Sequence, residues 1–173
     1  MISTSTGQLS LGHLMHGLDQ ASYKLACFIL AGANEMTIAT LRADGSPHAS
    51  TVSFASDGLV LYAAIAIDSH KAHDIREDGR ISLTVNAPFK NWNEIQGLSL
   101  DGVASMVDWP RGQEQASALL LKKLPAYVAL MGRSPSVPWP GMLFIRIVPT
   151  ALTLLDYTRH FGHSTHFKLT GLA

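Results

Sequence analysis

Charged residues, cysteine and long apolar runs are all scarce in this 173-residue chain. Asp, Glu, Lys and Arg make up 15% of the residues, well below the roughly one quarter of typical soluble proteins. Their formal net charge is +0 and they form no basic block, so neither a nucleic-acid surface nor an anionic-membrane surface is indicated. Because apolar residues reach 47%, we expect a partner to cover part of the surface, and a homodimer explains this better than a membrane.

The single cysteine, Cys27, excludes an intrachain disulfide, and its apolar surroundings are typical of an inert buried thiol. The longest apolar segment, residues 25–33, is too short to span a bilayer. The first residues lack the basic and apolar pattern of a signal peptide, which predicts a cytoplasmic protein. We expect one domain, with a helical region at about 10–31, a barrel at about 35–157 and a loop-like tail at 158–173.

Short segments in which apolar and polar residues alternate make up much of the chain. They predict strands over residues 36–41, 48–54, 59–66, 80–86, 96–107, 142–148 and 151–155. Helical spacing predicts short helices over 69–77 and 114–124, the second ending or kinking at Pro125. The expected fold is therefore mainly β, a split antiparallel β-barrel of about six strands with short flanking helices. Without repeated βαβ units or a glycine-rich dinucleotide loop, a Rossmann fold is not favoured.

The most informative stretch runs from Asp68 to Ile75, directly after an apolar strand. Ser69 is a typical helix N-cap, and Lys71 follows in the first turn. Free backbone N–H groups, a hydroxyl and a mobile cation together suit a phosphate group on a bound cofactor. Taken alone, the simpler alternative is favoured, in which Ser69 only caps the helix and Lys71 is solvated.

Four segments, residues 37–41, 44–48, 69–73 and 80–83, resemble the split-barrel flavoproteins of the pyridoxamine 5′-phosphate oxidase-like superfamily. This resemblance implies FMN at the interface of a homodimer and covers residues 35–108. It also implies the residues that contact FMN. They are Ser69, His70 and Lys71 at the phosphate, and Ser50, Thr51, Val52 and Ser53 along the flavin ring.

The chain departs from the true oxidases at several positions. They carry an arginine near Ser50 and a lysine near Ala55, and neither cation is present here. Each lost charge-assisted bond is worth about 1–3 kcal/mol, so weaker phosphate binding is expected. In the C-terminal substrate motif only His163 matches, and the required arginine is missing or shifted to Arg159, so oxidation of vitamin B6 is not expected.

Three histidines, His160, His163 and His166, recur in the tail. An imidazole there could exchange protons over a cofactor, which makes His163 the catalytic candidate, or the tail is simply solvated. No metal site is predicted, because the chain has no second cysteine and no HExxH helix. Trp92 and Trp139 lie beside loops, where either ring stacking or interface packing would explain them.

The leading hypothesis is an FMN-dependent oxidoreductase with an unknown small-molecule substrate, acting as a homodimer. One alternative is a haem-binding or haem-degrading protein in which a tail imidazole ligates iron. Another is a non-enzymatic flavin carrier or sensor, since a fold and a cofactor do not establish a reaction. A deazaflavin would meet Ser69 and Lys71 in the same way as FMN, so the sequence leaves that cofactor open as well.

Overall fold

A computed structural model describes residues 16–172, apart from 109 and 134. In chain order its elements are α1 (Gln20–Gly32), β1 (Glu35–Leu41), β2 (Pro47–Asp57), β3 (Val60–Ala66), α2 (His70–Glu77), β4 (Arg80–Asn86), the 3₁₀ turn η1 (Trp92–Glu94), β5 (Gln96–Met106), α3 (Arg111–Lys123), α4 (Pro125–Met131), β6 (Met142–Asp156) and β7 (Ser164–Lys168). The first part of the predicted N-terminal helical region, residues 10–15, lies outside the described residues.

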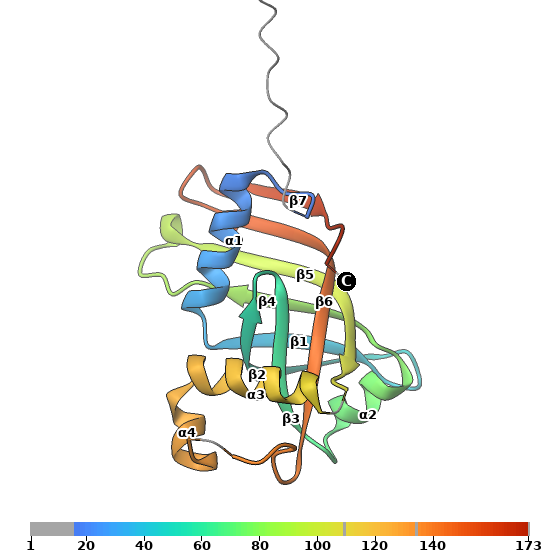
Figure 1. Cartoon of the computed structure of the whole chain (residues 1–173). Helices are drawn as coiled ribbons and strands as arrows, with labels where there is room; N and C mark the ends of the chain where they lie inside the picture. The colour runs from blue at the N-terminus through green and yellow to red at the C-terminus, as the bar shows by residue number, and fades with distance from the viewer. Residues whose placement is uncertain (1–15, 109, 134, 173) are drawn as a thin grey trace, which may run out of the picture.

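The strands form one antiparallel sheet in the order β3-β2-β1-β4-β5-β6-β7 (Figure 1). An additional pairing of β3 with β6 closes the first six into a barrel, and β7 adds to the outside of β6. Closure leaves few unpaired backbone edges, which is the physical reason that many short alternating strands favour a barrel. The predicted mainly β barrel of about six strands with short flanking helices is confirmed.

The barrel interior is filled by the apolar halves of the alternating strands. In β4, Ile81, Leu83 and Val85 are buried, while the residues between them are exposed. Helix α1 adds Ala26, Ile29 and Leu30 to the same core. Outside the barrel, α3 covers β3 and β6 through a second cluster, which includes Ala116, Leu120, Tyr62, Phe144 and Trp139.

The outer face of β1, β4 and β5 has no such cover from the described residues. Thr37 faces Thr51 on one side and Thr84 on the other, and Thr84 faces Ser99. All four side chains are exposed, so a row of hydroxyl groups crosses four strands. With small hydroxyl side chains and no covering helix, this face is open to contact with a second surface.

Two expectations for the C-terminal part are wrong. Two strands were predicted on either side of Pro149, but a single strand, β6, runs through this residue. It can do so because the β5–β6 register shifts beside Pro149, between Asp101 and Gly102. A bulge absorbs a residue that lacks an N–H donor. The tail is also not all loop, since residues 164–168 form β7, and Leu154 faces Thr165 across the new pair.

In the described part of the chain, no helix combines the length and apolar character needed to cross a membrane.

Candidate cofactor-binding site

The start of α2 has the geometry that the sequence predicts. Ser69 is in an extended conformation and its Oγ accepts a hydrogen bond from the Ala72 N–H at 3.3 Å. The same hydroxyl donates to the Ala66 carbonyl at 2.7 Å, so Ser69 would have to give up that bond to donate to a ligand. Because the first N–H groups of a helix lack intrahelical acceptors, the amides of His70 and Lys71 are the donors available at this helix start.

Strand β2 has an unpaired edge close to α2. Its pairing with β3 extends only from Phe54 to Asp57, whereas its pairing with β1 runs from Pro47 to Ser53. The first part of β2 therefore has a neighbouring strand on one side only, which is where the barrel is split. Alternate backbone groups along that edge are available to a ligand.

The four predicted ring-side residues are divided between two faces of β2. Ser50 and Val52 are partly buried on one face, because successive side chains of a strand point in opposite directions. Thr51 is exposed on the other face and lines a cleft of about 550 Å³ together with Thr37 and Thr84. The side chains of the four residues thus do not converge, and what they share is the backbone edge.

A buried polar group links α2 to the β1–β2 hairpin. Asp74 is 4% exposed and accepts a hydrogen bond from Thr40 Oγ1 at 2.7 Å. Its Oδ2 lies 3.4 Å from His48 Nδ1, and the rings of His48 and His70 meet edge to face with centroids 5.9 Å apart. The contact between His48 and Asp74 is not a hydrogen bond. His48 Nδ1 is therefore shut off from solvent and has no hydrogen-bond partner, and the same is true of Ser50 Oγ on the same strand.

The tail histidines lie at the other end of the barrel. His163 Nδ1 is 3.1 Å from His160 Nε2, whereas His166 Nδ1 is 2.7 Å from Thr153 Oγ1. The β6–β7 turn that carries the first pair lies on the opposite side of the molecule from α2 (Figure 1). Within one chain His163 therefore does not meet Lys71, and no group of three metal-ligating side chains occurs among the described residues.

Exposed aromatic side chains gather beside this histidine pair. Trp92 is 60% exposed and Phe161 is 73% exposed, with ring centroids 5.7 Å apart, and Tyr157 lies 5.2 Å from Phe161. We call Trp92, Tyr157 and Phe161 the aromatic cluster. Sequence reasoning singled out Trp92 but not the other two, whose approach depends on the fold. Trp139 is 1% exposed and donates to Ser117 Oγ, so it belongs to the core, and neither ring stacking nor interface packing, the two explanations left open for it, applies.

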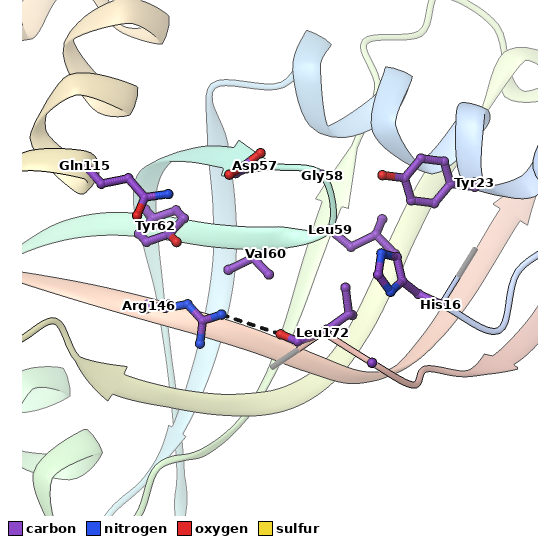
Figure 2. Close-up of a pocket in the computed structure, with 11 residues that line it drawn as sticks. His16, Tyr23, Asp57, Gly58, Leu59, Val60, Tyr62, Gln115, Arg146 and Leu172 are labelled. Carbon is purple, nitrogen blue, oxygen red and sulfur yellow. Dashed lines mark hydrogen bonds between the residues drawn. The ribbon is translucent and has the colours of Figure 1, made fainter. Parts of the chain in front are cut away.

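A separate hollow of about 480 Å³ opens between α1, α3 and the C-terminal segment (Figure 2). Arg146 and Asp57 are on its walls, and Arg146 donates to the Leu172 carbonyl at 3.5 Å. None of the residues predicted to bind a cofactor lines it. The hollow therefore lies apart from the α2 site.

Burial shifts the pKa values of Cys27 and Lys123. Burial raises the pKa of the Cys27 thiol, which disfavours the reactive thiolate, in keeping with the inert role expected for it. Burial lowers the pKa of Lys123 to about 8, although its ammonium donates to the Leu30 carbonyl at 2.7 Å and lies over the Phe54 ring. Neither residue lies at the start of α2.

Comparison with solved structures identifies the same fold in several proteins. The heme binding protein from Mycobacterium smegmatis has a TM-score of 0.72 at 19% identity, with 85% of this chain covered. This chain spans only 57% of that protein's length. HutZ, the heme storage protein from Vibrio cholerae, has a TM-score of 0.59 at 17% identity over 71% of this chain and 86% of its own. An F420 reductase has a TM-score of 0.54 at 23% identity over 72% of this chain and 93% of its own.

At such identities these likenesses establish the fold and leave the ligand open. A search of curated protein sequences found no match. The model of the family described as pyridoxamine 5′-phosphate oxidase, however, matches residues 24–154, which is most of the chain and includes α2 and the split edge of β2. The chain therefore belongs to the pyridoxamine 5′-phosphate oxidase family.

Proposed function

We propose that this protein is an FMN-binding flavoprotein that works as a homodimeric oxidoreductase on a small molecule. The observation that carries the proposal is the unpaired edge of β2 beside the capped start of α2. One feature offers backbone hydrogen bonds to a planar heteroaromatic ring, and the other offers amides and a cation to a phosphate. FMN carries both chemical groups in one molecule.

The residues present fit such a ligand. The amides of His70 and Lys71 and the Lys71 ammonium would hold the phosphate, while Ser69 keeps the helix start in place through its two hydrogen bonds. The backbone from Ser50 to Ser53 would lie along the ring, and the unpaired Ser50 Oγ is a buried polar atom that a ligand can satisfy. Bound flavin supplies one- or two-electron transfer, and the chain binds it, orients it and limits water access.

A second copy of the chain would complete the site. The exposed hydroxyl row on β1, β2, β4 and β5 is the surface on which we place the dimer contact. The β6–β7 turn, which carries Phe161 of the aromatic cluster, and α2 lie at opposite ends of the molecule (Figure 1), so a twofold axis across this face would bring the cluster of one copy to α2 of the other. His163 beside the cluster would then approach the partner's cofactor, as a proton donor or acceptor.

A haem-binding function is the second candidate. The adjacent rings of His160 and His163 offer imidazole ligands, and the exposed rings of Trp92 and Phe161 beside them offer apolar contacts for a porphyrin. The names of two similar structures, a heme binding protein and a heme storage protein, support this candidate. Similarity to an F420 reductase supports a deazaflavin at the α2 site in place of FMN, and a flavin carrier without turnover would use the same contacts.

The first experiment is an absorption spectrum of the purified protein, followed by the mass of any chromophore released on denaturation. Flavin bands with the mass of FMN support the proposal, a Soret band moves haem to first place, and a deazaflavin mass replaces FMN with that cofactor. If the protein is colourless, titration with FMN and with haemin decides between the two sites.

Replacement of Lys71 tests the phosphate contact directly. K71Q removes one charge-assisted bond and should weaken FMN binding about tenfold in an equilibrium titration. Lys24 is an exposed lysine on α1, so K24Q serves as the matched control and should bind FMN like the unmodified protein. Equal affinities for the K71Q and K24Q variants would remove Lys71 from the site.

A further inference from the structure

Two opposite charges face the hollow of Figure 2 without pairing with each other. Arg146 extends into it from β6 and Asp57 from the end of β2. In the part of the chain that the structure describes, neither side chain forms an ion pair. The Arg146 guanidinium makes one long hydrogen bond, 3.5 Å from Nη2 to the Leu172 carbonyl. Because a guanidinium carries several N–H donors, most of them remain available to a ligand.

The order of the strands keeps the two charges apart. Asp57 is paired with Val60 on one side of β3, and Arg146 is paired with Tyr62 on the other side. Residues that pair directly point to the same face of a sheet, so these side chains share the outer face of the barrel. Neighbouring strands lie about 4.8 Å apart, which places the backbones of β2 and β6 about 10 Å apart here. In Figure 2 the Val60 side chain lies between the two charged groups.

Other elements surround these charges and give the hollow its walls. Helix α3 covers the neighbouring part of this face, and its exposed Gln115 stands at the edge of the hollow next to Tyr62. Tyr23 of α1 and Leu172 of the C-terminal segment form the other wall. The volume of about 480 Å³ falls within the roughly 300–1,000 Å³ of typical small-molecule pockets. The hollow is therefore large enough for a ligand that reaches both charges.

The two charges select the kind of ligand. A simple anion would pair with Arg146 but would be repelled by Asp57, and a simple cation would meet the reverse arrangement. A molecule with a carboxylate at one end and an ammonium group at the other satisfies both side chains. Arg146 would bind the carboxylate through parallel N–H···O bonds, and Asp57 would accept hydrogen bonds from the ammonium group.

We propose that this hollow is a binding site for a small zwitterion, with Arg146 as the partner of its carboxylate and Asp57 as the partner of its ammonium group. The site is additional to the proposed flavin site, because none of the residues predicted to bind a cofactor lines the hollow. The separation of β2 and β6 favours amino acids whose charged groups stand at the two ends of a short chain over α-amino acids, whose charges are adjacent.

The test measures the binding of amino acids of increasing chain length, from glycine to ε-aminocaproate, to the full-length protein by chemical-shift changes in NMR spectra. Affinity should rise with chain length, and the tightest should bind at least about tenfold better than the acid or the amine of equal length that carries one charge. R146Q should remove the advantage over the amine, and D57N should remove the advantage over the acid. Arg42 is exposed and does not line the hollow, so R42Q is the matched control and should bind like the unmodified protein.

Several results would overturn the inference. If none of the amino acids binds, the hollow is not a zwitterion site, and if the acid or the amine binds as tightly as the zwitterion, the two charges do not act together. Equal affinities for the R146Q and R42Q variants would show that Arg146 makes no contact with the ligand. Asp57 is exposed, so D57N keeps the test valid should R146Q fail to fold.

Discussion

The hydrogen bond from Thr40 to Asp74 should be a main support of α2. Thr40 is 1% exposed and Asp74 is 4% exposed, so T40V would leave a buried carboxylate oxygen without its donor while keeping the side-chain shape. A hydrogen bond to a charged group contributes about 1.5–3 kcal/mol to the free energy of unfolding. For a chain of this size each kcal/mol corresponds to about 2–4 °C in Tm, so T40V should lower Tm by about 3–12 °C.

The matched control lies on the same strand. Thr37 is exposed on the outer face of β1, so T37V changes the same chemical group without removing a buried partner and should alter stability by less than about 0.5 kcal/mol. Urea denaturation of both variants measures the difference, with unchanged slopes as the sign that both unfold from the same native state. If T40V is as stable as T37V, Asp74 does not depend on Thr40, and the argument that α2 is fixed through this buried pair is wrong.

Two further predictions concern stability elsewhere in the chain. Burial lowers the folded-state pKa of Lys123 from 10.5 to about 8, so between these values the unfolded chain binds more protons than the folded chain. The free energy of unfolding should therefore rise as the pH is raised from 8 towards 10. Solvent screens this half-buried group, so the rise should be about 1–2 kcal/mol. It should be absent in K123M, and an identical pH profile for both proteins would contradict this. A Cβ atom on Gly102 would lie 2.5 Å from the Val148 carbonyl oxygen, so G102A should destabilise the β5–β6 bulge by about 1–3 kcal/mol in urea denaturation. At Gly97 the nearest atom belongs to the Asn86 side chain, which can turn away, so G97A should cost less; the reverse order would show that the bulge tolerates a side chain.

Features that depend on neighbouring residues could be predicted from the sequence. The Ser69 cap, the helix break before Pro125 and the alternation of β4 all follow from side chains within one or two turns. Features set by pairing between distant strands could not. Continuity of β6 through Pro149 depends on the opposite strand, where the register shifts next to Gly102. Strand β7 needs the edge of β6 as a template, and nothing local indicates that edge.

The candidate site likewise has parts that neighbouring residues predict and parts that depend on distant residues. The start of α2 was recognisable because a capping serine, a lysine and a preceding apolar strand are consecutive. His48 and Asp74 are 26 positions apart, and each looks like an ordinary polar residue until the β1–β2 register and the packing of α2 bring them to 3.4 Å. Ser50 to Ser53 were expected to act together, yet strand alternation separates their side chains and leaves the backbone edge as their common contribution.

The position of the split in the barrel explains why the unpaired edge of β2 and the start of α2 lie near each other. Strand β3 leaves β2 after the Phe54–Ala63 pair and continues along β6, so the chain must turn back over the open end before it can enter β4. Helix α2 makes that return, which is why its first turn lies near the unpaired edge of β2. The hydrogen bond from Thr40 to Asp74 anchors α2 to β1 and keeps the helix start near the backbone edge of β2. The proposed ligand, with a flat polar ring at one end and a phosphate at the other, would use both of these features, whereas an anion without the ring would use only one.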